Sequence, residues 1–158
     1  MTELNDAEIW RLDTFIVPPG SLAGGTCVVS GREGHHGADV MRVREGDPVR
    51  LIDGAGEAAL ARVDTVGGAT LTCSITERRT HARAGAVALT VAQALLKGRS
   101  LDDVVRRLAE LGTAGIRPLV TERTIGRIPP DTLDSRLERW GSIAAAAVKQ
   151  SRGVFLPE

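Results

Sequence analysis

The pattern of apolar residues changes near residue 77, and this change constrains the fold more than any other feature of the sequence. Before it, short runs rich in β-branched residues are separated by turn signals roughly every eight to twelve residues, a spacing typical of a small barrel or sandwich. Beyond it, apolar runs alternate with segments of helical periodicity, which predicts a parallel sheet with right-handed crossover helices. The sequence therefore predicts two unlike domains and an α+β protein overall.

The first half, residues 1–77, contains five strand-like runs that end at glycine- or proline-containing turns. The expected strands are 15–17, 26–29, 48–52, 57–63 and 69–75. Tight turns are expected at Asp53–Gly54 and at Gly67–Gly68. One segment, 34–43, carries His36, Val40 and Val43 at helical spacing, so a helix is predicted there.

Residues 78–85 are polar and rich in arginine, which predicts a linker before a second domain at 86–158. That domain begins with a continuous apolar run, 87–95, as expected of a strand covered on both faces. A second strand is predicted at 116–120 and a third from Val154. With helices after Ser100 and after Pro129, the predicted order is β-α-β-α-β.

The two predicted helices have distinct faces. Ser100 is expected to cap the first helix, and Gly112 to end it in a left-handed conformation. The expected buried stripe is Leu101, Val104, Val105, Leu108 and Leu111, and the expected solvent face is Asp102, Asp103, Arg106, Arg107 and Glu110. On the second helix, the side chains expected to be buried are Leu133, Leu137, Trp140, Ile143 or Ala144, and Val148, with Arg136 and Arg139 in solvent.

The charge of the chain is divided unequally between its halves. Residues 1–77 carry six arginines against twelve acidic residues, whereas residues 78–158 carry fourteen basic residues against eight acidic ones. A net charge of about +6 in the second half suits a polyanion such as nucleic acid. It is equally explained by heavy arginine usage in a GC-rich genome.

Cysteine and histidine usage argues against a disulfide framework and against a metal site. Cys27 and Cys73 each lie in an apolar run, which fits reduced thiols. His35 and His36 are adjacent, so their side chains diverge, and His81 is the only other histidine. A zinc site needs four convergent ligands, so no metal is expected. The acidic start, MTELNDAEIW, lacks a signal sequence, and a cytoplasmic, non-membrane protein is the expectation.

Three stretches together resemble the 16S ribosomal RNA uridine-N3 methyltransferases (RsmE). The stretch HHGADVMRVREGDPVRLIDGAG resembles the amino-terminal RNA-binding domain of that family. The stretch QALLKGRSLDDVVRRLAELGTAGIRPLVTER resembles its strand–Lys-Gly–helix–Glu-Leu-Gly–strand segment, and RWGSIAAAAVKQS resembles its next helix. The order Arg152–Gly153 departs from the usual small residue followed by arginine.

This resemblance implies a small PUA-like β-barrel followed by the first βαβαβ part of an α/β SPOUT (trefoil-knot) domain. It implies methylation of a uridine N3 in 16S ribosomal RNA of the small ribosomal subunit, with S-adenosylmethionine as cofactor and a homodimer as the assembly. Because the family's cofactor-binding knot lies beyond the last strand present here, we expect a chain truncated before the knot, whose cofactor-binding residues are unknown. Such a chain is expected to transfer no methyl group.

The resemblance and the predicted topology together select the site residues. In an α/β domain ligands lie at the carboxyl ends of the strands. The residues proposed to contact RNA are His36, Arg42, Arg44, Lys97, Arg99, Glu122 and Gln150. Arg123 and Arg152 are the catalytic candidates, because positive charge stabilises the anion that develops at N3. Each has a structural alternative: a packing role for His36, solvated surface for the arginines, and a Glu122–arginine ion pair that only joins two loops.

Two other functions stay open at this point. The chain is alternatively a truncated, non-catalytic RNA-binding module or pseudoenzyme, or a structural dimerisation fragment with no role in RNA binding. Salt-dependent RNA binding distinguishes the RNA-binding module from the structural fragment.

Overall fold

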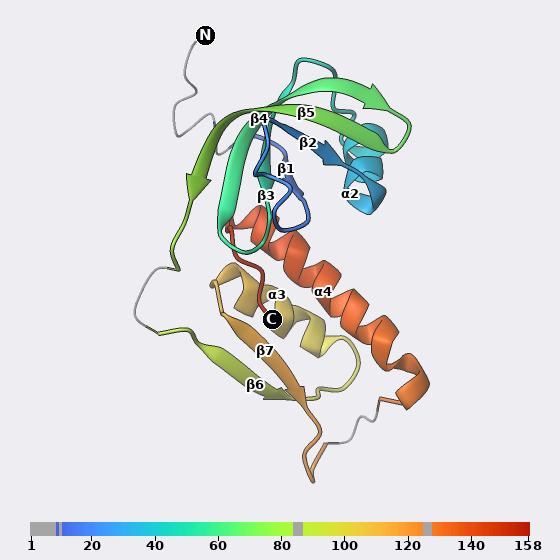
Figure 1. Ribbon diagram of the computed structural model, residues 1–158. Coiled ribbons are helices and arrows are strands. Elements are labelled where there is room, and N and C mark those ends of the chain that lie inside the picture. Colours follow the sequence, from blue (N-terminus) through green and yellow to red (C-terminus); the bar gives the residue numbers. More distant parts are fainter. Residues whose placement is uncertain (1–8, 10, 84–86, 125–127) are drawn as a thin grey trace. The chain divides into compact units, whose positions relative to one another are not determined.

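A computed structural model describes residues 9, 11–83, 87–124 and 128–158 of the 158-residue chain. The chain divides into two compact units, Met1–Ala82 and Arg83–Glu158 (Figure 1). Residues 78–80, within the predicted linker, belong to the last strand of the first unit. Residues 84–86 of that linker lie outside the described part of the chain.

The first unit is built on one five-stranded sheet of order β1-β3-β4-β5-β2. β1 pairs in parallel with β3, and the other neighbours are antiparallel. The strands are β1 Thr14–Ile16, β2 Thr26–Val29, β3 Pro48–Ile52, β4 Glu57–Gly67 and β5 Thr70–Thr80. The predicted strands are all present, and β4 and β5 are longer than expected because their hairpin continues through two register shifts.

The helix predicted at 34–43 begins earlier and packs through glycine. It consists of α2, Gly31–His35, continued by a π-helical turn η1, His36–Val40. A Cβ on Gly34 would lie 2.1 Å from the backbone oxygen of Ala69, and one on Gly37 would lie 2.7 Å from Leu71 Cδ1. The buried face of the helix is thus set by its glycines, while Val40 is exposed.

The core of the first unit lies between the sheet and this helix. Its fully buried side chains include Phe15, Val29, Val49, Leu51, Val63 and Leu71. Cys27 and Cys73 are also buried, free thiols, and they are direct cross-strand partners in β2 and β5. Burial raises the pKa of Cys73 to about 11.

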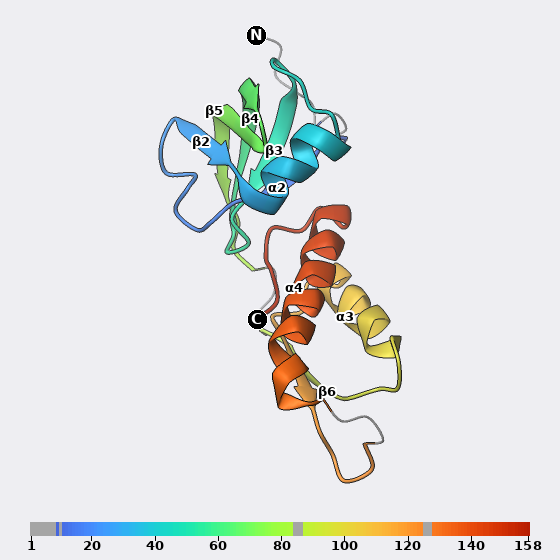
Figure 2. The same cartoon turned by 90° about the vertical axis from the view of Figure 1, so that its right-hand side faces the viewer.

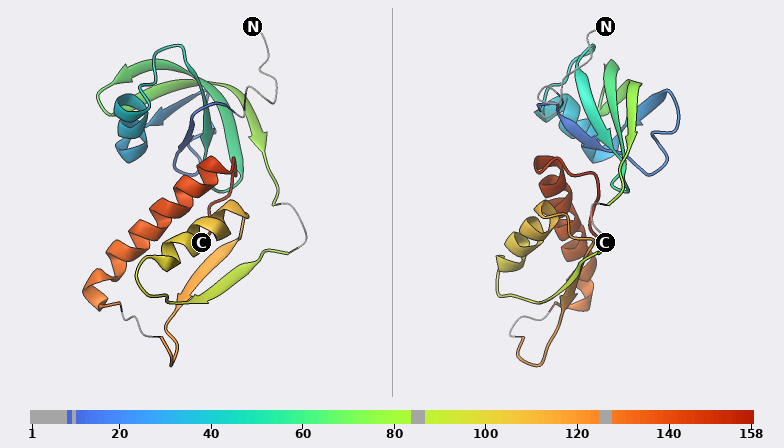
Figure 3. Two further views of the ribbon diagram at one scale, coloured as in Figure 1. Left: turned by 180° about the vertical axis from the view of Figure 1, so that it is seen from behind. Right: turned by 90° about the vertical axis from the view of Figure 1, so that its left-hand side faces the viewer.

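The second unit follows the predicted order of elements as far as its second helix. β6, Thr90–Ala94, and β7, Gly115–Leu119, form a parallel pair. Between them lies α3, Ser100–Glu110, and after them a 3-10 turn η2, Pro130–Thr132, leads into α4, Leu133–Gln150. α3 and α4 lie side by side, as Figures 2 and 3 show from several directions.

Among the described residues no strand follows α4, and the segment from Val154 meets β7 through its last residue. The Glu158 N–H donates to the Ala114 carbonyl, and the Glu158 carbonyl accepts from the Ile116 N–H. Glu158 thus forms backbone hydrogen bonds with the two residues that flank Gly115, which is the hydrogen-bond pattern of parallel strands. The segment is also tied to Arg83, whose guanidinium lies 4.6 Å from the centroid of the Phe155 ring.

Several packing predictions for the second unit are wrong. Ser100 is the first residue of α3 rather than its cap, and no side-chain hydrogen bond caps that end. Leu111 is 81% exposed, because α3 ends there and Gly112 turns the chain with a φ of 76°. The Gly112 and Thr113 N–H groups close the helix on the Ala109 and Leu108 carbonyls, which is a Schellman motif.

The first turns of α4 and the first residues of the run 87–95 are less buried than predicted. Leu133 and Leu137 are 42% and 48% exposed, and the buried residues of α4 begin at Trp140. Val87 is 80% exposed and precedes β6. Alternating burial along β6 shows that one face is covered, not both. Apolar periodicity identified these segments but not the neighbours that cover them.

Candidate functional site

The carboxyl ends of β6 and β7 place four of the predicted residues on neighbouring loops. Lys97 and Arg99 follow β6, with Gly98 between them at a φ of 66°. Glu122 and Arg123 follow β7, and all four side chains are exposed. Parallel strands bring both loops to one edge. The structure therefore brings these residues to the edge where an α/β domain binds ligands.

The loop after β7 is held by its two threonines. Thr124 Oγ1 accepts a hydrogen bond from the Thr121 N–H at 2.8 Å, and the two hydroxyls lie 2.9 Å apart. Glu122 and Arg123 lie between these threonines. No ion pair joins Glu122 to an arginine within the described residues, so the alternative of a loop-joining ion pair finds no support there.

Gln150 and Arg152 lie at the other end of the second unit. α4 runs back from the carboxyl edge of the strands towards their amino edge (Figure 1). Its 18 residues span about 27 Å, so Arg152 and Arg123 do not form one cluster within this chain. Arg152 has a φ of 60°, and Gly153 N–H bonds the Val148 carbonyl, so arginine occupies the left-handed capping position that glycine usually fills.

The first unit carries the remaining candidates on and after the π-helical turn. His36 is half-buried at the start of η1. Arg42 and Arg44 are exposed on either side of the buried Val43, whose N–H bonds the Gly37 carbonyl. Arg42 has a φ of 57°, and apart from Arg152 it is the one non-glycine residue with a positive φ among the described residues. Such strain and π-turns are frequent at functional sites.

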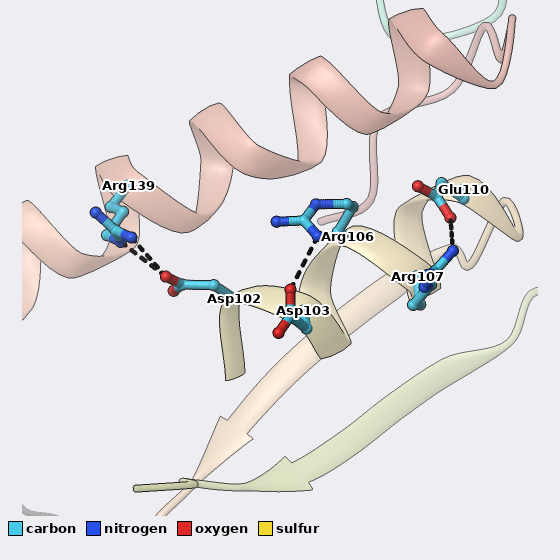
Figure 4. A network of polar contacts seen from close by, with 6 residues as sticks. All are labelled: Asp102, Asp103, Arg106, Arg107, Glu110 and Arg139. Carbon is cyan, nitrogen blue, oxygen red and sulfur yellow. Dashed lines mark hydrogen bonds and ion pairs between the residues drawn. The ribbon is translucent and has the colours of Figure 1, made fainter. Parts of the chain in front are cut away.

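A polar network between α3 and α4 was missed by sequence reasoning (Figure 4). Asp102 was expected in solvent, yet its residue is 8% exposed. One carboxylate oxygen, Oδ2, accepts from Nε and Nη2 of Arg139, and the other, Oδ1, accepts from the indole N–H of Trp140 at 3.1 Å. These contacts correct the expected solvation of Asp102, whereas Arg139 is exposed as predicted and has Asp102 as its partner.

Hydrogen bonding to Arg139 lowers the pKa of Asp102, with a further lowering from the Trp140 hydrogen bond and opposition from burial. The same hydrogen bond raises the pKa of Arg139. Asp102 is thus a buried anion with satisfied oxygens. The available sequence signal was an aspartate beside Leu101 at the start of a helix, which does not distinguish a solvated residue from one that meets an arginine from another helix.

Two family models match the two units in order. The model described as an RNA methyltransferase PUA domain matches residues 29–76, and the model described as an RNA methyltransferase domain matches residues 83–158. Proteins named ribosomal RNA small subunit methyltransferase E from Synechocystis sp. and Mycobacterium tuberculosis are 29% and 30% identical over 143 and 134 residues. These alignments cover 90% and 85% of this chain. The chain is therefore similar to the RsmE methyltransferases through both of its units.

Solved structures support the RsmE fold for both units together. A Neisseria gonorrhoeae ribosomal RNA small subunit methyltransferase E, bound to S-adenosylmethionine, matches with a TM-score of 0.83 and 27% identity. A Legionella pneumophila methyltransferase with the same bound cofactor matches with a TM-score of 0.85 and 26% identity. They cover 93% and 94% of this chain, which confirms the predicted PUA-like and SPOUT-type architecture.

The chain spans about half the length of its curated RsmE relatives, 45% and 51% for the two named above, and about 60% of the solved chains. Among the residues that the structure describes, no helix has the length and apolar character needed to cross a membrane. No cluster of three or more metal-ligating side chains occurs among the described residues either.

Proposed function

We propose that this protein acts in the S-adenosylmethionine-dependent methylation of a uridine N3 in 16S ribosomal RNA. The observation that carries the proposal is the match of both units, in order, to relatives of that family, two of them solved with S-adenosylmethionine. The proposed partner is the small ribosomal subunit, the proposed assembly is a homodimer, and the proposed location is the cytoplasm.

The proposed reaction needs an exposed base and a nearby cation. N3 lies on the pairing edge of uridine, so the target base must be unpaired or extruded from a helix. Methyl transfer removes the N3 proton, and a positive group close to N3 stabilises the developing anion. S-adenosylmethionine supplies the methyl group when bound, and holding donor and base in line provides much of the rate.

Among the catalytic candidates, we assign the anion-stabilising role to Arg123. Its loop lies at the carboxyl edge of β6 and β7 and is ordered by Thr121 and Thr124. Arg152 follows the far end of α4, a helix about 27 Å long, so we assign it, with Gln150, to RNA binding at the opposite edge. The strained φ of Arg152 is consistent with a role that requires arginine at this position.

RNA binding is proposed to involve both units. In the first unit, the exposed Arg42 and Arg44 are proposed to contact phosphates, and the half-buried His36 to stack on or bond a base. In the second unit, Lys97 and Arg99 are the proposed phosphate-binding cations of the carboxyl edge, and Glu122 is proposed to accept hydrogen bonds from a base.

The experiment incubates the protein with small ribosomal subunits and S-adenosylmethionine carrying a labelled methyl group. Label in 16S RNA, together with a reverse-transcription stop at one uridine, supports the enzyme. Where the wild-type protein transfers label, Arg123→Gln is expected to reduce the rate by about 10²–10³-fold, as loss of one anion-stabilising donor does in other enzymes. Label at another atom or another RNA contradicts the assignment.

The same samples test the alternative of a non-catalytic RNA-binding module. Salt-dependent binding to a 16S hairpin without methyl transfer, and without calorimetric binding of S-adenosylmethionine, favours the module. Failure to bind RNA at low salt contradicts both functions and leaves the structural fragment.

A further inference from the structure

A pocket of about 200 Å³ opens in the second unit between the loop after β6, the start of α3 and the first half of α4. Its apolar lining includes Leu95, Leu101 and Trp140, which are 8%, 3% and 7% exposed. Leu101 lies on α3 and Trp140 on α4, two helices that pack together, and Leu95 directly follows β6. The pocket therefore has a floor fixed by the core of the unit.

The charged lining of this pocket is not neutral. Arg99, Arg136, Arg139 and Asp102 all contribute to it. Arg139 is paired with Asp102, so these two charges cancel. Arg99 and Arg136 have no side-chain hydrogen bond or ion pair within the part of the chain that the structure describes. Two guanidinium groups are thus left beside an apolar floor, one from the loop before α3 and one from α4.

This combination selects an anion attached to an apolar or planar group. A guanidinium presents paired N–H donors that match phosphate oxygens. The floor of Leu101 and Trp140 suits a sugar or the face of a base. At about 200 Å³ the pocket is smaller than the roughly 300–1,000 Å³ of sites that enclose a drug-sized ligand. It fits one nucleotide unit better than a complete cofactor.

We propose that this pocket is a phosphate-binding subsite, in which Arg99 and Arg136 hold one phosphodiester group of an RNA strand. The proposal rests on the proposed function and deepens it, because it adds Arg136 to the residues that contact RNA. The Asp102–Arg139–Trp140 network forms one wall, so the subsite is ordered before RNA binds. Trp140 reports on its occupancy.

The test measures binding of a fluorescently labelled, uridine-containing single-stranded RNA by anisotropy at several salt concentrations. Each phosphate contact with a single strand contributes about 0.7 to the slope of log K against log salt. Arg136→Gln is therefore expected to lower the slope by about 0.7 and to weaken binding about fivefold at 0.1 M salt. The double variant Arg99→Gln/Arg136→Gln is expected to weaken binding further but to lower the slope by no more than about 0.7, because both arginines hold the same phosphate.

The matched control is Arg107→Gln, which removes the same charge from the exposed face of α3. Arg107 is paired with Glu110 and does not line the pocket. An unchanged slope in Arg136→Gln, or an equal change in Arg107→Gln, overturns the subsite. If the wild-type protein binds no RNA at low salt, the proposed function fails with it. Wild-type binding with an unaffected Arg136→Gln variant defeats the subsite alone.

A second measurement uses Trp140 in a Trp10→Phe background, where it is the only tryptophan. RNA is expected to change its emission, and Arg136→Gln is expected to reduce that change at equal RNA concentration. Uridine monophosphate is titrated in parallel, to compare a free nucleotide with the RNA. If the mononucleotide gives the same change at lower concentration than RNA, the pocket binds free nucleotides and the RNA assignment is wrong.

Discussion

Replacing Asp102 with alanine removes the shared acceptor of the network between α3 and α4. The buried indole N–H of Trp140 is then left without its partner, which costs about 1–3 kcal/mol. The Arg139 side chain is 49% exposed, so solvent screens its ion pair and we assign no additional cost to losing it. We expect Asp102→Ala to lower the free energy of unfolding of the second unit by about 1–3 kcal/mol.

The assay is urea unfolding followed by Trp140 emission in the Trp10→Phe background. The control is Asp103→Ala, which removes a carboxylate that is exposed and paired only with Arg106 on the same helix. Its expected cost is below about 0.5 kcal/mol. Equal costs for the Asp102 and Asp103 variants would refute the reasoning, because burial of the network would then contribute nothing.

The network also predicts a pH dependence. Since the pKa of Asp102 is lowered in the folded state, its stabilising contribution is complete above the unfolded-state pKa of about 3.9 and is lost as the pH falls through the folded value. The difference in unfolding free energy between wild type and Asp102→Asn is therefore expected to be constant near pH 7 and to shrink below about pH 4. A difference that grows on acidification contradicts the assigned direction.

Three further predictions concern packing, capping and thiol chemistry. Gly34→Ala is expected to destabilise the first unit by about 3 kcal/mol or more in urea unfolding, because the new Cβ meets backbone oxygens. The control Gly67→Ala, whose Cβ enters open space, is expected to change stability by less than about 0.5 kcal/mol. Equal effects of the two variants contradict the packing of the helix through Gly34. Arg152→Gly is expected to raise the unfolding free energy of the second unit by about 1 kcal/mol, because glycine adopts the left-handed φ without strain. The same variant is expected to weaken RNA binding. A loss of stability contradicts the strain argument. Cys27 and Cys73 are expected to resist thiol reagents until urea unfolds the unit, because burial raises the pKa of both thiols, and rapid native-state labelling contradicts this.

The thiol pair shows what register adds to a sequence. Cys27 and Cys73 are far apart in the chain, and no local pattern predicts that one lies opposite the other. The Ile75 N–H bonds the Gly25 carbonyl, and hydrogen-bonded and non-hydrogen-bonded pairs alternate along the ladder, so the two cysteines occupy a hydrogen-bonded pair. At such pairs the Cα atoms are further apart than at the alternate ones.

Local sequence patterns determined the elements of this protein and the edge where its ligands are expected. Turn residues ended β2 and β3 where predicted, Gly112 ended α3, and the order of motifs predicted the similarity to the RsmE methyltransferases. These features depend on neighbours within a few residues, so one chain suffices to predict them.

Tertiary structure alone decided which helix faces are buried and which charges meet. Asp102 lies on α3 and Leu111 is the residue that follows it, and apolar periodicity assigned both to the wrong environments. A helix places a residue on a face, but whether that face meets solvent, an arginine or an apolar side chain depends on a partner distant in sequence. The path of α4 across the second unit also decides which site residues lie together. It places Arg152 at the opposite edge from Arg123, and it brings Arg136 into the same pocket as Arg99.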